Sequence, residues 1–201
     1  MTKEAVFSAH AFVYEQQDGN ETKRYSWMNI RIANEADYFE VMSFYEFMCE
    51  ELARRSFLHA GNQGGYPSEC MVKEAIHQDG LIIGEEDGEI IAALILNHTA
   101  DPAYSKVKWQ IDAAPEKVTI MHALRVNPKH GGRGYGKAMV NYSIAMAKTA
   151  GQKTIRLDTL DENTIAQKLY QTVGFSFIDT VEIEYKDIGE PRILYCYELV
   201  L

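Results

Sequence analysis

The 201-residue sequence has few cysteines, few prolines and no long hydrophobic run. Its three cysteines are far apart and form neither a CxxC pair nor a Cys/His set with zinc spacing, so we expect reduced thiols, no disulfide framework and no metal. No stretch approaches the about eighteen apolar residues of a membrane span, and no signal peptide is recognisable. These absences favour a cytoplasmic protein that does not enter a membrane.

Basic residues are also in the minority. The 20 lysines and arginines face 29 aspartates and glutamates, which gives a formal net charge of −9. This balance argues against a protein that binds nucleic acid by neutralising phosphates. It mildly favours a cationic small substrate or, as the interpretation we prefer, indicates nothing beyond solubility. Hydrophobic residues make up 46% of the chain, as in a globular protein. At this length we expect one domain, over residues 28–201, preceded by an extension over 1–27.

The extension contains a β-prone patch and then a polar stretch, residues 16–23, that is typical of a turn or linker. The patch fits an added strand, a contact in a homodimer or a loose tail, and the sequence leaves all three open. Its members are Val6, Phe7, Phe12, Val13 and Tyr14.

From residue 28 the apolar pattern alternates between strand and helix periods. Asn34 is a candidate N-cap before a long helix, and Asp87-Gly88 is a hairpin signal between two apolar runs. Antiparallel hairpins at both ends and one strand–helix–strand crossover predict a mixed α/β fold, with a mostly antiparallel sheet and helices on both faces. The predicted strands are 30–32, 81–83, 90–96, 118–126, 154–158, 175–185 and 192–199, and the predicted helices are 38–52, 68–79, 135–150 and 163–173.

A glycine-rich loop joins the strand ending at Val126 to the helix starting at Tyr135. Glycine lets backbone amides approach a ligand closely, and the helix N-terminus adds N–H groups and a positive dipole end. The loop therefore predicts a phosphate or pyrophosphate site, to which Arg133 and Lys137 add positive charge. A simple chain reversal would need fewer glycines. The loop glycines are Gly131, Gly132, Gly134 and Gly136.

Two common nucleotide patterns nearly fit this loop. Residues 131–137 match GxxxxGK, but Ala138 follows where a P-loop needs the Ser or Thr that holds Mg²⁺. A GxGxxG pattern cannot be placed, because Lys-Ala-Met follows the last glycine. A nucleotide-binding protein is therefore a weaker alternative.

The loop and a downstream segment together resemble a known family. Val126-x-Pro128 followed by Gly132-x-Gly134-x-Gly136-Lys137-Ala138 is similar to the acyl-CoA motif of the GNAT superfamily of N-acetyltransferases. Asn163-x-x-Ala166-x-x-Leu169-Tyr170-x-x-x-Gly174-Phe175 resembles a second signature of that family. The resemblance implies a GNAT-like fold with a splayed strand pair, acetyl-CoA as co-substrate and a primary amine as acceptor. One departure is Gly131, which stands where the family has Arg or Gln; Arg133 or His130 could supply a cation.

The resemblance also implies roles for individual residues. Backbone groups of Leu124 and Val126 pair with the pantetheine arm and polarise the thioester carbonyl. Tyr170 protonates the departing thiolate, although it could instead only pack. Asn163 could bind pantetheine or only cap its helix. The implied acetyl-CoA contacts are Leu124, Arg125, Val126, Gly131, Gly132, Arg133, Gly134, Tyr135, Gly136, Lys137, Asn163, Ala166 and Tyr170.

The general base and the acceptor are less defined. His122 is the first candidate base, because it lies four residues before Val126 and shares its strand face if no bulge intervenes. Asp158 and a water chain are alternatives. The acceptor, which could be a polyamine, an antibiotic, an amino acid or a protein N-terminus, would meet the variable aromatic and acidic segments. These are 57–66, Tyr104, Trp109, Tyr195 and Tyr197, with Glu46, Glu50 and Glu198. A CoA-binding sensor without turnover is the rival hypothesis.

Overall fold

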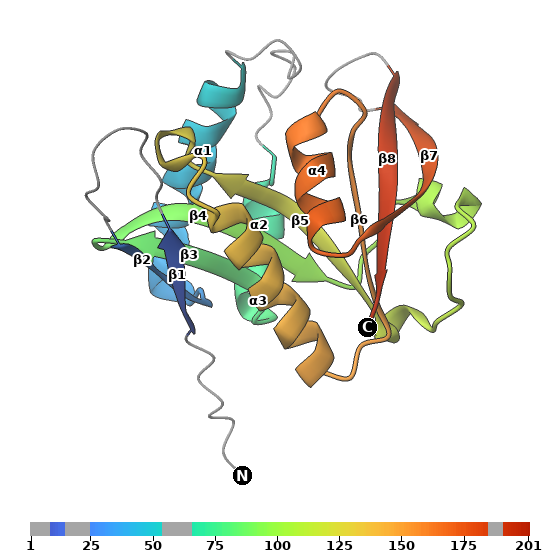
Figure 1. Ribbon diagram of the computed structural model, residues 1–201, viewed down its shortest axis with the longest axis horizontal. Helices are drawn as coiled ribbons and strands as arrows, with labels where there is room; N and C mark the ends of the chain where they lie inside the picture. Colours follow the sequence, from blue (N-terminus) through green and yellow to red (C-terminus); the bar gives the residue numbers. More distant parts are fainter. Residues whose placement is uncertain (1–8, 15–24, 54–65, 185–190) are drawn as a thin grey trace.

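A computed structural model describes residues 9–14, 25–53, 66–184 and 191–201. One eight-stranded sheet organises this part of the chain, in the order β1-β2-β3-β4-β5-β6-β8-β7 (Figure 1). Its strands are β1 (Ala9–Tyr14), β2 (Tyr25–Ile32), β3 (Leu81–Glu86), β4 (Glu89–Asn97), β5 (Val118–Val126), β6 (Thr154–Leu160), β7 (Ser176–Glu184) and β8 (Pro191–Val200).

Helices cover both faces of the sheet. The α-helices are α1 (Tyr38–Ala53), α2 (Glu69–His77), α3 (Tyr135–Thr149) and α4 (Thr164–Thr172). Short 3₁₀ turns are η1 (Glu35–Asp37), η3 (Pro102–Lys106), η4 (Pro115–Lys117) and η5 (Pro128–His130). None of the helices in the described ranges is long and apolar enough to cross a bilayer.

The sheet is mixed, as predicted. Every neighbouring pair of strands is antiparallel except β5 and β6, which are parallel and connected through α3. These two strands pair only from Val118–Thr154 to Ile120–Arg156. Beyond that point β5 continues toward the glycine-rich loop while β6 stays paired with β8. The predicted splayed pair is therefore present, and we call the opening after Ile120 and Arg156 the β5–β6 split.

Buried residues divide into clusters on the two faces. α1 and α2 pack with Leu81, Ile83, Ala93 and Ile95 on one face. α3 packs with Ile82, Leu94 and their neighbours on the other, and α4 lies on the α3 side (Figure 1). Because helices cover both faces, the sequences of the central strands are continuous apolar runs and do not alternate between apolar and polar residues. We refer to these as the α1/α2 face and the α3/α4 face.

The N-terminal patch contributes a strand. β1 pairs with β2 along its whole length, from Ala9–Ile30 to Tyr14–Tyr25. Val6, Phe7 and the stretch 16–23 lie outside the described residues. The sheet therefore includes part of the predicted extension, and β2 begins at Tyr25, before the expected start at Met28. A homodimer contact at this edge stays a prediction.

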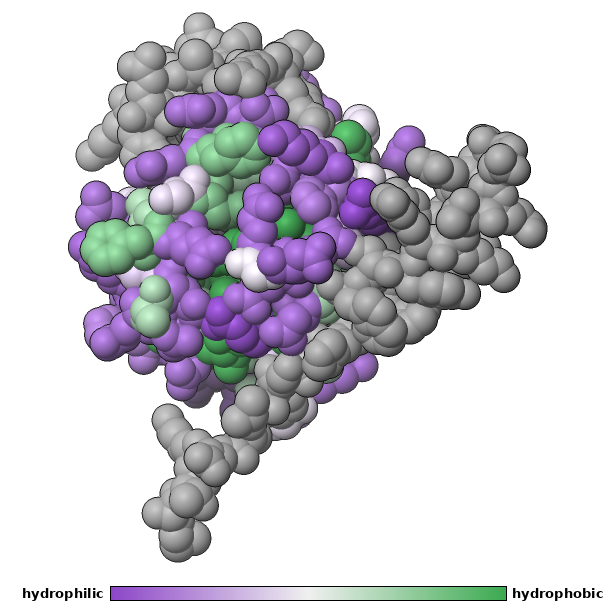
Figure 2. Space-filling view, turned by 90° about the vertical axis from the view of Figure 1, so that its left-hand side faces the viewer, coloured by the Kyte–Doolittle hydropathy of each residue, from purple (hydrophilic) through white to green (hydrophobic). Residues whose placement is uncertain are grey.

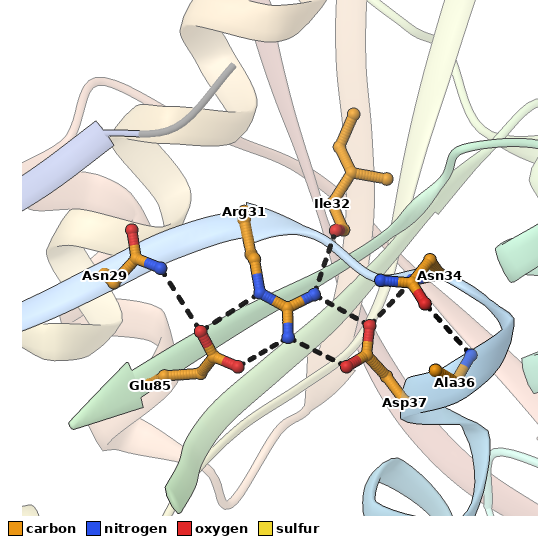
Figure 3. Close-up of polar contacts among 7 residues, drawn as sticks. All are labelled: Asn29, Arg31, Ile32, Asn34, Ala36, Asp37 and Glu85. Carbon is orange, nitrogen blue, oxygen red and sulfur yellow. Dashed lines mark hydrogen bonds and ion pairs between the residues drawn. The ribbon is translucent and has the colours of Figure 1, made fainter. Parts of the chain in front are cut away.

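An arginine network fastens the start of α1 to the sheet (Figure 3). The Arg31 guanidinium donates to both oxygens of Asp37, at 2.7 and 2.8 Å, and to Glu85. Asp37 also accepts the backbone N–H of Asn34, whose side chain accepts from Ala36, so the predicted cap is confirmed and precedes α1 through η1. The guanidinium holds the pKa of Asp37 below its ordinary value.

The predicted hairpin turn is also confirmed, since Asp87 and Gly88 both have positive φ, as a two-residue hairpin of type I′ requires. Ser68, where the predicted second helix starts, caps α2 by accepting the N–H of Met71. The side of the molecule seen in Figure 2 is mostly hydrophilic among the described residues, with hydrophobic side chains in small separate areas.

Candidate active site

A bulge in β5 decides which residues reach the β5–β6 split. The register with β4 shifts between Ala93 and Ile95, and Ala123 has a φ of 51°. His122 pairs with Ile95 and Arg125 with Ala93, so both lie on the α1/α2 face. Val126 instead packs in the cluster under α3. The expectation that His122 and Val126 share a face is therefore wrong, because an inserted residue inverts the alternation of a strand.

The predicted pantetheine strand borders the split. Leu124 and Val126 are partly buried against the α3 cluster, as ordinary core residues would be. Their strand edge has no β6 partner beyond Ile120. The Leu124 carbonyl accepts a hydrogen bond from Nη1 of Arg125 at 3.0 Å. Apart from that contact, the β5 edge has no strand partner here among the described residues, so its other main-chain groups are available to a ligand that enters the split.

The glycine-rich loop keeps N–H groups without acceptors. Gly132 and Gly134 have φ values of 79° and 81°, which glycine adopts without steric cost. The first backbone hydrogen bond of α3 runs from the Ala138 N–H to the Gly134 carbonyl, at 3.0 Å. Within the described chain, the N–H groups of Gly134, Gly136 and Lys137 have no acceptor. Such groups at a helix N-terminus suit a phosphate.

Glu86 holds the loop against the β3–β4 hairpin. Its carboxylate lies 2.7 Å from Nδ1 of His130, accepts the Tyr135 hydroxyl at 2.8 Å and lies 3.5 Å from the Arg133 guanidinium. His130 and Arg133, the two residues expected to compensate for Gly131, therefore share one carboxylate. Gly131 itself donates its N–H to the Pro128 carbonyl, at 3.1 Å, within the turn. Sequence reasoning missed Glu86, because its position before Asp87-Gly88 marks it only as a hairpin residue.

The two motifs meet in space. A Cβ built on Gly136 would lie 3.2 Å from Cδ2 of Leu169, so glycine allows α3 and α4 to approach closely. Asn163 caps α4 by accepting the Ala166 N–H at 3.2 Å, which confirms the capping interpretation. Ala166 packs on the same cluster as Leu169. The segment that carries Tyr170 is thereby fixed relative to the loop.

Tyr170 lies in the α3/α4 core near the split. Its side chain is 6% exposed and its ring lies 5.8 Å from Phe175 and 6.0 Å from Tyr197. Its hydroxyl has no hydrogen-bond partner among the described residues. Burial raises the pKa of Tyr170, and the Arg125 charge opposes part of that rise. The phenol is therefore protonated at neutral pH and can donate a proton.

Both candidate bases lie on the α1/α2 face. Nε2 of His122 lies 2.9 Å from Oδ1 of Asn97, and burial lowers the pKa of its imidazole. Asp158 lies on β6, paired with Cys196, and accepts the Tyr104 hydroxyl at 2.8 Å. Burial raises the pKa of Asp158. Each group is thus tuned toward its neutral form.

The predicted acceptor residues separate into two groups. Burial is the main cause that raises the pKa of Tyr66, to about 12, and the pKa of Tyr104. The charge of Asp158 raises both further, so Tyr66 and Tyr104 lie near Asp158. Glu198 is fully buried and bound to Arg156 at 2.8 Å, so the prediction that it attracts an ammonium is wrong. The ring of Trp109 lies against the Arg156 guanidinium. Tyr197 is buried and Tyr195 is partly buried, whereas Glu46 and Glu50 are exposed. Residues 57–65 lie outside the described ranges.

Comparison with known sequences identifies the fold. The profile of the acetyltransferase (GNAT) family matches residues 46–175. The chain belongs to this family. A mycothiol acetyltransferase from Cellulomonas flavigena is 28% identical over 128 residues, which are 61% of this chain and 35% of that protein. The chain spans 35%, 42% and 38% of three curated relatives that it matches.

Solved structures with the GNAT fold cover most of the chain. A GNAT-family acetyltransferase from Streptococcus agalactiae superposes with a TM-score of 0.72 at 20% identity, covering 87% of this chain and 95% of its own. An acetyltransferase from Salmonella typhimurium, solved with its cofactor acetyl-CoA, has a TM-score of 0.61 at 16% identity over 87% and 94% of the two chains. In the described residues, no group of three His, Cys, Asp or Glu side chains could hold a metal ion.

Proposed function

We propose that this chain transfers an acetyl group from acetyl-CoA directly to a primary amine. The observation that carries the proposal is the β5–β6 split, which opens between a loop with unpaired N–H groups and the unpaired Tyr170 hydroxyl. Family membership and an acetyl-CoA complex of a protein with the same fold support it.

The chain offers acetyl-CoA a continuous set of contacts. The N–H groups at the start of α3 and the Lys137 side chain bind the diphosphate, and the free edge of β5 pairs with the pantetheine arm. The Asn163 amide adds a contact from the start of α4. The contact residues are those that the sequence predicts: Leu124, Arg125, Val126, Gly131, Gly132, Arg133, Gly134, Tyr135, Gly136, Lys137, Asn163, Ala166 and Tyr170.

The chemistry is a nucleophilic substitution at the thioester carbonyl. The neutral amine attacks the carbonyl carbon, the C–N bond forms and the C–S bond breaks. Tyr170 gives its proton to the departing thiolate and is then reprotonated from solvent, while the proton lost by the amine passes to a base and then to solvent. A backbone N–H of the free β5 edge polarises the carbonyl oxygen.

We propose His122 as the base that takes the amine proton. Its lowered pKa keeps the imidazole neutral and able to accept a proton near pH 7. Asp158 is the competing base, since it lies on the same face and on the other strand of the split. Comparison of His122→Gln with Asp158→Asn separates the two. Loss of the true base should lower kcat by about 100-fold or more, the lower end of general-base effects, and loss of the other residue should lower kcat by less than about threefold.

Two measurements test the function. Calorimetry with acetyl-CoA and with ATP–Mg²⁺ should detect binding of the first only, whereas binding of ATP–Mg²⁺ alone would favour the nucleotide alternative. A panel of amines, followed by release of free CoA, should yield at least one acetylated acceptor. Acetyl-CoA binding without turnover on any amine would instead favour the sensor. Size-exclusion chromatography and cell fractionation test the homodimer and the cytoplasmic location, which belong to the same proposal.

A further inference from the structure

The side chain of Arg125 lies on the α1/α2 face, where the acceptor is expected, while its backbone belongs to the β5 edge that borders the split. Its backbone pairs with Ala93, and its charge acts on Tyr45 of the α1 cluster as well as on Tyr66 and Tyr170. The bulge at Ala123 produces this orientation. Without the bulge, position 125 would point toward α3, so the fold specifically presents this guanidinium to the α1/α2 face.

The guanidinium of Arg125 lacks an acidic partner within the described chain. Nη1 donates to the Leu124 carbonyl, and Nε is buried with no hydrogen-bond partner. By contrast, Arg31 binds Asp37 and Glu85, and Arg156 binds Glu198. A guanidinium offers five donors, and an unsatisfied donor away from water costs free energy. A ligand that brings acceptors would remove this cost.

Asp158 occupies the opposite side of the same opening. It lies on β6 beyond the last β5–β6 pair, and its neighbour Cys196 packs in the cluster with Tyr104 on the α1/α2 face. The charges of Asp158 and Arg125 act on both Tyr66 and Tyr170, so both phenols lie within electrostatic range of the two groups. The split therefore has a carboxyl group on its β6 side and a guanidinium on its β5 side.

We propose that the acceptor is an amine that also carries a carboxylate, such as an amino acid, with its carboxylate on Arg125 and its amino group toward Asp158. The inference rests on the proposed acetyl transfer and narrows its acceptor. Arg recognises the planar carboxylate through paired hydrogen bonds, and the carboxylate neutralises a charge that the described protein leaves unpaired. An amine with no anionic group would leave the Arg125 donors unsatisfied.

The test uses matched acceptors that differ only in that charge. Each L-amino acid of a panel, with glycine, β-alanine and 4-aminobutanoate, is compared with its carboxamide in CoA release by the full chain. Because the amine pKa differs between acid and amide, the readout is the acid-to-amide ratio of kcat/KM, compared between wild type and variants. Arg125→Gln should lower this ratio at least tenfold, Arg125→Lys should lower it less, and Arg192→Gln, an arginine on β8, should leave it unchanged.

Several results would overturn the carboxylate assignment. Equal losses on acid and amide in Arg125→Gln would place Arg125 in the reaction centre or the fold. A panel in which other amines react and amino acids do not, or in which aminoalkyl phosphonates are preferred, would also reject it. If Arg125→Gln does not fold, Arg125→Lys gives the same ratio test. A failed transfer reaction is distinguishable, because then no amine of any class releases CoA, whether or not calorimetry detects acetyl-CoA binding; both proposals fall in that case.

Discussion

The arginine network at the start of α1 and the arginine in the β5–β6 split differ in what satisfies them. The Arg31 guanidinium donates five hydrogen bonds within the protein, with two carboxylates and the Ile32 carbonyl as acceptors. Arg125 has one backbone acceptor and a buried Nε without a partner among the described residues. The first arrangement stabilises the fold, and the second leaves binding capacity for a ligand.

The same difference extends beyond the arginines. The Tyr45 hydroxyl donates to the Ala123 carbonyl at 3.2 Å, while the Tyr170 hydroxyl has no partner in the described chain. Buried polar groups in folded proteins are almost always paired. Among the described residues, Nε of Arg125 and the Tyr170 hydroxyl lack partners and border the β5–β6 split, where function is expected. Oε1 of Gln152, also buried without a partner in the described chain, lies beyond the far end of α3. Variants of the paired groups should change stability, and variants of the unpaired groups should change binding or turnover.

Tyr170→Phe should have the largest effect. The change removes the hydroxyl and keeps the ring contacts with Phe175 and Tyr197. If the hydroxyl protonates the thiolate, kcat should fall by about 10²–10⁴-fold, with little change in acetyl-CoA affinity. Steady-state kinetics on an identified acceptor and calorimetry with acetyl-CoA measure the two quantities.

Tyr142→Phe is the control for that experiment, because Tyr142 is a buried tyrosine of the α3 cluster. It should retain wild-type kcat. A wild-type kcat in Tyr170→Phe itself would show that Tyr170 only packs, and would remove it from the mechanism.

Gly134→Val should weaken acetyl-CoA binding by well over tenfold. The side chain would crowd the unpaired N–H groups at the start of α3, and a β-branched residue is strained at a φ of 81°. Gly151→Val is a matched control, since Gly151 follows the other end of α3 with a φ of 67° and open space around it. Both variants should lose comparable stability in urea unfolding. Calorimetry that finds equal acetyl-CoA affinity in the two would reject the diphosphate site at the loop.

Local sequence signals predicted the elements of the fold well. Asn34 and Ser68 act as caps, and Asp87-Gly88 forms the hairpin turn, because each depends on interactions within a few residues. The glycine-rich loop and the segment from Asn163 to Phe175 predicted the family through their spacing. The divergence of β5 from β6 was predicted from that family resemblance, because hydrophobic periodicity does not show where two paired strands separate.

Features that depend on distant partners could not be predicted. The bulge at Ala123 reverses the direction of His122 relative to Val126, and alanine carries no sequence signal for a positive φ. Glu86 and Glu198 were assigned to a turn and to an acceptor site, but their partners lie 42 or more positions away, at His130 and Arg156 for example. Such pairings are set by sheet topology, which a single sequence does not specify.

Asp37→Asn should affect stability alone. The amide cannot form the ion pair with Arg31, so the free energy of unfolding should fall by about 1–2 kcal/mol at pH 7, the scale of a charge-assisted hydrogen bond that is partly exposed. Acetyl-CoA affinity should match wild type. Urea unfolding and calorimetry check both, and a loss of affinity without a loss of stability would contradict the division between paired and unpaired regions.

The same ion pair makes a pH prediction. The pKa of Asp37 is lowered in the folded protein, mainly by the hydrogen bond from Arg31. The stabilisation that the ionised carboxylate gives the folded state is therefore complete above the ordinary pKa near 3.8, and it is lost as pH falls through the lower pKa of the folded protein. The stability difference between wild type and Asp37→Asn should therefore be constant from pH 7 to about 5 and shrink on further acidification. A difference that persists unchanged well below pH 3.8 would exclude the ion pair as its origin.

Asn163 should give the smallest effect, and it tests whether one residue serves both regions. Its Oδ1 caps α4 through the Ala166 N–H, while its side-chain amide donates no hydrogen bond within the described chain. Asn163→Ala should lower the free energy of unfolding by about 1 kcal/mol, and Asn163→Ser should restore most of that loss, because serine also caps. If the amide binds pantetheine, Asn163→Ser should still raise KM for acetyl-CoA by roughly 2–10-fold, the scale of one neutral hydrogen bond. A wild-type KM in Asn163→Ser would make Asn163 a cap and nothing more.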